Sequence, residues 1–186
     1  MRLTGLELRR QLLHMTFGIV LIALLYFGII NNYHMVAILL GGLLVSKLCT
    51  LRRIPLASWV MDRFERKEFR TTFPGKGPIF FMIGSIIVLF LFPLNIALAA
   101  MVILSVGDAI SHIAGKLLCK RTYKHLKSVE GTVVAIIASF FGVLIFVNFF
   151  AALAGTCLTL FFEDLKLGIE DNLFIPIVAA IIMSLF

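Results

Sequence analysis

The residues best suited to chemistry surround Asp108, an aspartate inside a long apolar stretch of the chain. A carboxylate in such a stretch is unfavourable unless it is paired or hydrated, which makes it a candidate functional group. Ser111, His112 and Gly115 follow at helical spacing, so all four residues share one face of a helix. The side chains of Asp108 and His112 can therefore touch. We favour a metal-binding or proton-transfer role, and a structural Asp–His hydrogen bond between helices is the alternative.

Basic residues crowd the segment that follows Asp108. Its lysines recur at near-helical intervals and are Lys116, Lys120, Lys124 and Lys127. Such a series alone is typical of a cytoplasmic membrane interface. This series lies between two carboxylates, Asp108 and Glu130, and lysines combined with acids suit a metal ion bound to a polyphosphate.

The segment Lys127-Ser128-Val129-Glu130-Gly131-Thr132 has the composition of a helix N-terminus. Ser128 or Thr132 could cap the helix, with Glu130 near the positive end of its dipole. A helix N-terminus also binds phosphate, so capping and catalysis are compatible. The sequence lacks the G-x-x-x-x-G-K-[ST] pattern of a P-loop enzyme. Gly75-Lys76-Gly77 is too short for that loop, although its flexible backbone could reach an anion.

Two further polar clusters flank the apolar part of the chain. Glu7, Arg10, His14 and Gly18 fall on one helical face near the N-terminus, where a charge-paired entry into the membrane is the structural alternative. Near the C-terminus, acidic and amide side chains precede a proline, and helix capping is the structural alternative there. These residues are Glu163, Asp171, Asn172 and Pro176.

The composition is that of an integral membrane protein. Of the 186 residues, 61% are hydrophobic and 15% are charged, and the mean hydropathy is +1.06. A soluble domain usually has about a quarter charged residues. We predict an all-α, polytopic protein with residues 1–186 forming a single domain. Its seven expected spans are 12–30, 35–51, 78–92, 95–118, two within 132–162, and 173–186.

The pair within 132–162 decides between seven spans and six. Asn148 and Gly155 are the places where the chain could turn between two short helices. A single, strongly tilted helix is the alternative, because about thirty apolar residues exceed the thickness of the hydrocarbon layer.

The basic residues predict the orientation. The net charge of +7 comes from Lys and Arg at the N-terminus and in residues 52–76 and 116–127, whereas residues 31–34 and 93–95 have none. The positive-inside rule then predicts a cytoplasmic N-terminus and a cytoplasmic polar face. No nucleic-acid-binding module is recognisable, so we expect no nucleic-acid partner.

Residues 52–77 form the predicted cytoplasmic, amphipathic connection, with a surface helix over 56–69. Its apolar face would hold Leu56, Trp59, Val60 and Phe64, and its polar face Arg63, Arg66 and Lys67. We expect a membrane-anchoring helix, and a lid over a lipid site is the alternative.

Taken in order, these segments resemble the membrane lipid-kinase family of dolichol kinase, phytol kinase and CTP-dependent diacylglycerol kinase. The motifs are Glu7-x-Arg9-Arg10-x-x-x-His14-x-x-x-Gly18, Gly75-Lys76-Gly77, Gly107-Asp108…Gly115-Lys116, Lys127-Ser128-x-Glu130-Gly131-Thr132 and Glu163…Asp171-Asn172-x-x-x-Pro176. The resemblance covers most of the chain, and the ordered set is more specific than any single motif. Cys119-Lys120 departs from the pattern where the family often has a glycine.

The resemblance implies transfer of the γ-phosphoryl group of CTP to the hydroxyl of a membrane isoprenoid alcohol or diacylglycerol. Asp108 and Glu130 would hold Mg²⁺, with Asp171 or Asn172 assisting. His14 or His112 would accept the alcohol proton. The candidate nucleotide contacts are Arg10, Lys76, Lys116, Lys120, Lys127, Ser128, Gly131 and Thr132.

Three other hypotheses stay open. Phosphatidate cytidylyltransferases also combine an aspartate, a basic stretch and Lys-Ser/Thr-x-Glu-Gly, but their longer C-terminal Asp-rich signature is not visible in this sequence. A transporter with an Asp108–His112 relay would distribute its polar residues through several spans, whereas those of this chain gather towards one face. The third hypothesis is a non-catalytic lipid-binding scaffold.

Overall fold

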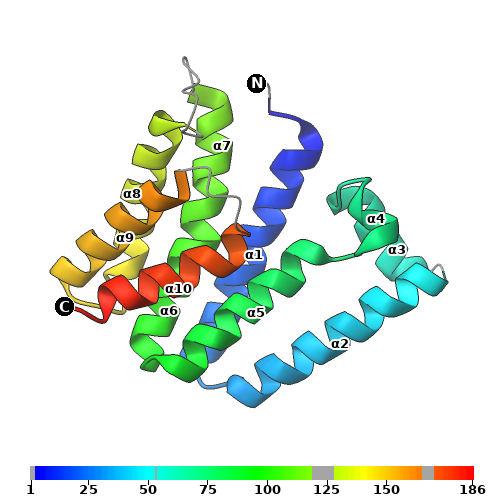
Figure 1. The fold of residues 1–186 in the computed structure, drawn as a ribbon, viewed down its shortest axis with the longest axis horizontal. Helices are drawn as coiled ribbons and strands as arrows, with labels where there is room; N and C mark the ends of the chain where they lie inside the picture. Colours follow the sequence, from blue (N-terminus) through cyan, green and yellow to red (C-terminus); the bar gives the residue numbers. More distant parts are fainter. Residues whose placement is uncertain (1–2, 53, 119–127, 165–169) are drawn as a thin grey trace.

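The computed structural model describes residues 3–52, 54–118, 128–164 and 170–186, and the regular structure in these ranges is helical. This confirms the all-α class (Figure 1). The elements are α1 (Gly5–Tyr26), α2 (Asn32–Leu51), α3 (Pro55–Phe64), α4 (Phe69–Thr72), α5 (Lys76–Leu91), α6 (Leu94–Val102), η1 (Ile103–Gly107), α7 (Asp108–Leu118), α8 (Val129–Val143), α9 (Phe149–Asp164) and α10 (Asp171–Met183).

The centre of the fold is one helix of 25 residues, Leu94–Leu118, which comprises α6, η1 and α7. Its α6 part is packed on all sides by α1, α5, α8 and α10, and Ala97, Ala99 and Met101 have no exposed surface. The alanines let the neighbouring helices approach closely, as is usual where helices pack inside a membrane. The α7 part begins with Asp108 beside this core and runs towards one end of the molecule (Figure 1).

Helix length and surface character fit a membrane protein. α1, α2 and Leu94–Leu118 are long and apolar enough to cross a bilayer, whereas α5, α8, α9 and α10 are apolar but shorter. Large apolar side chains such as Leu44, Phe141 and Ile145 are exposed on the outside of the bundle. Apolar exposure of this extent is expected where lipid surrounds the protein. The number of crossings stays a prediction.

Residues 132–162, for which one helix or two were possible, fold as parts of two helices, α8 and α9, with a turn between them at residues 144–148. The Asn148 side chain begins α9 by accepting a hydrogen bond from the Ala151 N–H at 2.9 Å. The single-helix alternative is therefore wrong for these residues, and the turn at Asn148 is confirmed. Gly155 does not turn the chain but lies inside α9, where a Cβ atom would stand 2.5 Å from Cγ of Met183.

The connection between α2 and α5 is a bent corner rather than one surface helix. α3 ends at Phe64 instead of continuing to residue 69, and α4 follows after a break. The Arg70 guanidinium stabilises this corner by donating to the Asp62 carboxylate at 3.0 Å and to the Asp62 carbonyl at 2.7 Å. The Glu65 carboxylate accepts the Gly75 N–H at 3.1 Å, which ties the corner to the start of α5.

In the described part of the chain, the connections that carry basic residues lie at one end of the bundle, and the connections without them lie at the other (Figure 1). The N-terminus, the end of α7 and the α3–α4 corner lie towards one end, whereas the α1–α2 and α5–α6 connections and the C-terminus lie towards the other (Figure 1). The charge pattern predicts this separation. Which end faces the cytoplasm stays a prediction.

Candidate active site

A cavity of about 920 Å³ lies between α1, α3, α7 and the first residues of α5 and α10. Its size is typical of small-molecule sites, which span roughly 300–1,000 Å³. One part of its wall is apolar, with Leu13, Phe17, Val45, Ile54, Leu56, Ala57, Val60, Met61 and Phe64. The other part is polar, with Glu7, Arg10, His14, Glu65, Arg66, Asp108, His112, Lys116, Glu170 and Asp171. A ligand that fills this cavity would be amphipathic.

Four side chains next to the polar part form a potential metal site. Asp108, His112, Glu163 and Asp171 each offer a ligand atom, and these atoms all lie within 4.8 Å of one another. They come from α7, α9 and α10, and Asp108 and Glu163 are buried, with 6% and 1% exposed. Carboxylate oxygens with one imidazole nitrogen form a donor set that suits a divalent cation.

The π-helical turn η1 determines where Asp108 points. The Asp108 N–H donates to the Ile103 carbonyl, one residue further back than in an α-helix, where it would donate to Leu104. The Leu104 carbonyl instead accepts a hydrogen bond from Nε2 of His14, at 3.1 Å. This contact fixes α1 against the start of α7, and π-turns of this kind are frequent at functional sites.

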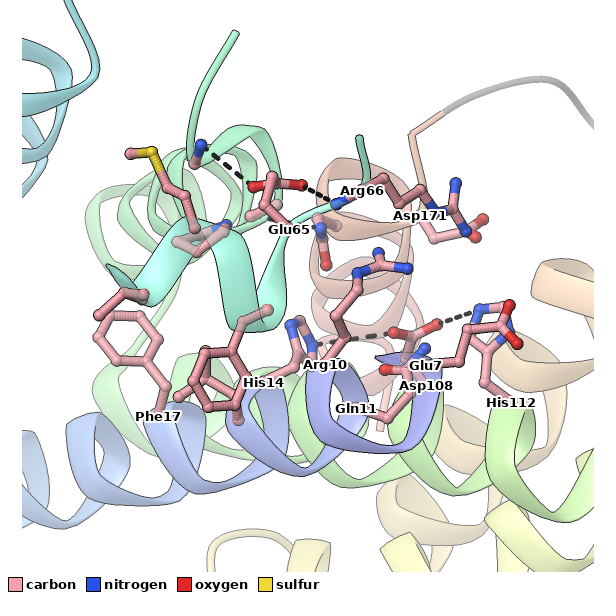
Figure 2. Close-up of a pocket in the computed structure, with 18 of the residues that line it drawn as sticks. Glu7, Arg10, Gln11, His14, Phe17, Glu65, Arg66, Asp108, His112 and Asp171 are labelled. Atoms are coloured by element: carbon pink, nitrogen blue, oxygen red, sulfur yellow. Dashed lines mark hydrogen bonds and ion pairs between the residues drawn. The ribbon is translucent and has the colours of Figure 1, made fainter. Parts of the chain in front are cut away.

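Asp108 lies between two histidines. Its Oδ1 is 3.3 Å from Nε2 of His112, and its Oδ2 is 3.8 Å from Nε2 of His14. Figure 2 shows both contacts, with Asp108 between the two rings. The expected contact between Asp108 and His112 is confirmed. His14, the other predicted candidate for accepting the alcohol proton, joins them from a different helix.

Gly18 lets α1 approach η1 closely enough for these contacts. A Cβ atom on Gly18 would stand 2.3 Å from Cβ of Ser105, so only glycine fits. At the other end of the interface, the Lys116 ammonium pairs with the Glu7 carboxylate. Lys116, a predicted triphosphate contact, lines the cavity but makes this ion pair with α1.

The segment 128–132 caps and packs the start of α8. Ser128 Oγ accepts the Gly131 N–H at 3.2 Å, and Oγ1 of Thr132 donates to the Ser128 carbonyl at 2.9 Å. A Cβ on Gly131 would stand 2.5 Å from the Ser111 carbonyl and 2.6 Å from the Gly115 nitrogen. The prediction that Ser128 caps this helix is confirmed. Gly115 and Gly131 let α7 and α8 pack in close contact.

Glu130, predicted to share the metal with Asp108, is not part of the acidic group in the described chain and does not line the cavity. Its carboxylate lies 3.4 Å from Ser128 Oγ at the start of α8. Glu163 takes its place in the group. The reason is that α9 packs against η1 and α10, and its last turn places Glu163 close to Asp108, whereas Glu130 starts its own helix.

Asn172 and Lys76 hold α10 and α5 together. Nδ2 of Asn172 donates to the Gly77 carbonyl at 3.3 Å, and the Lys76 ammonium pairs with the Glu170 carboxylate. Asn172 lines the cavity and Lys76 does not. Two other predicted nucleotide contacts, Lys120 and Lys127, lie outside the described residues.

Sequence reasoning missed two residues of the site. The sequence pattern indicates a helix cap for Glu163, whereas the structure places it in the last turn of α9. The feature of the sequence that could identify it is an acid at the end of a long apolar segment. The helical pattern predicts Arg66 on the water-facing side of a surface helix. In the structure that helix ends at Phe64, and Arg66 lines the cavity.

Comparison with known proteins does not assign the site. No protein-family model matches the chain. An uncharacterized protein of Methanocaldococcus jannaschii is 28% identical over 187 residues, covering 96% of this chain and 93% of that protein. No solved structure matches. The lipid-kinase resemblance therefore stays a prediction, and the function must be argued from the site.

Proposed function

We propose that the protein is a membrane lipid kinase that transfers the γ-phosphoryl group of a nucleoside triphosphate, CTP by resemblance, to a lipid alcohol. The observation that carries this proposal is one cavity with an apolar wall beside α3 and an acid–histidine group at its other side. Such a cavity suits a substrate with a hydrocarbon body and one reactive hydroxyl. Isoprenoid alcohols and diacylglycerol both have this form.

Mg²⁺ fits the donor set of the acidic group. Asp108, Glu163 and Asp171 offer carboxylate oxygens, the ligands that Mg²⁺ prefers, and the His112 imidazole also admits Mn²⁺. When bound, the ion would neutralise charge on the triphosphate. This proposed set differs from the one that the resemblance implies, which is Asp108 and Glu130 with Asp171 or Asn172 assisting.

The transfer itself needs positioning and one proton acceptor. The lipid hydroxyl oxygen would form the new bond to the γ-phosphorus, while the bond from that phosphorus to the β–γ bridging oxygen breaks and the nucleoside diphosphate leaves. A carbonyl can only accept a hydrogen bond, so Nε2 of His14 carries a proton where it contacts Leu104. Nδ1 of His14 is then the atom able to accept the proton of the alcohol.

Label transfer tests the proposal. Purified protein is incubated with Mg²⁺, CTP labelled at the γ or the α phosphate, and geranylgeraniol, a polyprenol or diacylglycerol as acceptor. We expect γ label on one lipid alcohol. Label from the α position on lipid would make the protein a cytidylyltransferase, and no label on any lipid would overturn both enzymes.

Asp108→Asn supplies the catalytic control. It keeps the shape of the side chain but removes its charge, so lipid labelling should fall below detection while the thermal unfolding temperature stays close to that of the wild type. Full activity of this variant would remove Asp108 from the reaction. Glu68→Gln is the matched charge-removing variant, since the Glu68 side chain is exposed and does not line the cavity.

A further inference from the structure

Two arginines from distant segments line the cavity between its apolar and acidic parts. Arg10 lies on α1, one turn before His14, and Arg66 follows the end of α3. Both arginines line the cavity, and Figure 2 shows Arg10 rising from α1 above Asp108 while the Arg66 side chain extends towards Asp171 in this view. The charge of Arg66 is close enough to act unfavourably on that of Arg10.

Neither guanidinium makes an ion pair within 4.0 Å in the part of the chain that the structure describes. The carboxylates of Glu65, Glu7 and Asp108 favour the charge of Arg10 from a longer distance. The two glutamates nearby have other contacts. Glu7 pairs with Lys116, and the Glu65 carboxylate accepts the backbone N–H groups of Gly75 and Arg66. Two like charges that face one cavity without an ion-paired carboxylate favour a shared anionic ligand.

The position of Arg66 is built into the fold. Arg70 fixes the corner after α3 through Asp62 and through the Glu65 carbonyl, to which its Nε donates at 3.2 Å. Glu65 ties the same corner to Gly75 at the start of α5. Two other arginines on the same segments, Arg9 and Arg63, do not line the cavity.

The apolar neighbours indicate what carries the anion. Met61 and Phe64 of α3 lead up to Arg66, and Leu13 and Phe17 follow Arg10 on α1, and all four line the apolar part of the cavity. We infer that Arg10 and Arg66 bind a phosphate monoester whose apolar body occupies this part of the cavity. This inference rests on the proposed function, because such a lipid phosphate is the product of the proposed transfer.

Equilibrium binding without nucleotide tests the inference independently of turnover. The probes are geranylgeranyl monophosphate, geranylgeraniol, inorganic phosphate and CTP, measured on purified protein in detergent. Arg10→Gln and Arg66→Gln should each weaken monophosphate binding by about 10- to 100-fold, the usual loss of a charge-assisted hydrogen bond. Binding of the alcohol should change less than about threefold by the same measure. Arg9→Gln and Arg63→Gln are the matched controls and should bind the monophosphate like the wild type.

Binding of CTP and of inorganic phosphate shows whether the arginines bind the nucleotide, free phosphate or a lipid phosphate. If the two variants weaken CTP binding and leave monophosphate binding unchanged, the arginines serve the nucleotide and the inference is overturned. Inorganic phosphate binding as tightly as the lipid monophosphate would also overturn it, because the apolar body would then contribute nothing. Should a Gln variant unfold, Arg10→Lys and Arg66→Lys keep the charge, and weaker monophosphate binding is still expected because lysine lacks the planar fork.

The inference and the proposed function fail separately. Arginine-dependent binding of the monophosphate without any label transfer would leave the binding site standing and remove the kinase. Label transfer with monophosphate binding that is independent of both arginines would keep the kinase and remove the binding site.

Discussion

Asp108 depends on contacts that its own helix supplies only in part. His112 reaches it along α7, but His14 comes from α1, Glu163 from α9 and Asp171 from α10. A single carboxylate in an apolar helix is unfavourable, and the two histidines beside Asp108 offset part of that penalty. Glu163 and Asp171 add like charge at the same point, which a bound cation would relieve.

Measurements of metal binding can decide whether Glu163 or Glu130 is a ligand. Glu163→Gln should weaken Mn²⁺ binding at least about tenfold, because it removes a charged ligand from the acidic group. Glu130→Gln should leave Mn²⁺ binding unchanged, since Glu130 lies outside that group. Electron paramagnetic resonance of free Mn²⁺ measures both. The opposite order would restore the pair predicted from sequence, Asp108 with Glu130.

At the scale of elements, the contact of α1 with η1 positions His14. The π-turn frees the Leu104 carbonyl for His14, and Gly18 brings the two helices together one turn further along. His14 and Asp108 lie on separate helices, and this close approach is what fixes the distance between their side chains.

Gly18→Ala should therefore lower stability. The new methyl group would meet the Ser105 side chain, and overpacking of this kind destabilises by about 1–3 kcal/mol. Gly42→Ala is the control, because nothing lies within 4 Å of a Cβ there. Thermal unfolding in detergent measures both variants. An unfolding temperature for Gly18→Ala equal to that of the wild type would contradict the close approach, and the double variant with Ser105→Gly should recover most of the loss.

α3 has residues suited to each of the two roles considered for it from the sequence. Trp59 is exposed and does not line the cavity, as suits a membrane-anchoring face, whereas Val60, Met61 and Phe64 line the cavity. The lid alternative is thus supported by the residues that the helix directs towards the cavity.

Val60→Asp tests this role of α3. A charge in the apolar part of the cavity should weaken geranylgeraniol binding by about tenfold or more, because an unpaired carboxylate would be buried against hydrocarbon. Ser58→Asp lies on the same helix outside the cavity lining and should bind the alcohol normally. Equal effects of both variants would show that charge anywhere on α3 acts through the membrane surface instead.

At the scale of the whole molecule, the helix order separates basic from uncharged connections. The ends that carry Arg10, Arg66 and Lys116 lie together around the cavity, and the α1–α2 connection and the C-terminus lie at the far end (Figure 1). This placement suits the proposed function, because a site at one end of the bundle could take up nucleotide from one side of a membrane and lipid from within it.

Cysteine accessibility tests the predicted orientation. In a protein whose native cysteines are replaced by serine, Tyr33→Cys should react with a membrane-impermeant maleimide added to intact cells. Ser58→Cys should react only after the cells are opened, because α3 is predicted to face the cytoplasm. Labelling of both cysteines in intact cells would contradict a cytoplasmic α3, and the reversed pattern would invert the whole topology.

The sequence by itself determined the properties that act locally. Composition and apolar stretches gave the all-α class, helical spacing gave the contact of Asp108 with His112, and a serine before Glu130 gave the cap of α8. Each depends on neighbours in the chain, so periodicity and propensity are sufficient to predict it.

Only the tertiary structure decided which distant residues meet. Glu130 lies in the first turn of one apolar helix and Glu163 in the last turn of another, and no local pattern shows that the path of α9 brings Glu163 to Asp108. The π-turn at η1 and the corner that directs Arg66 into the cavity likewise arise from packing between helices. Long-range contacts depend on how whole helices fit together, and that information is spread over the entire chain.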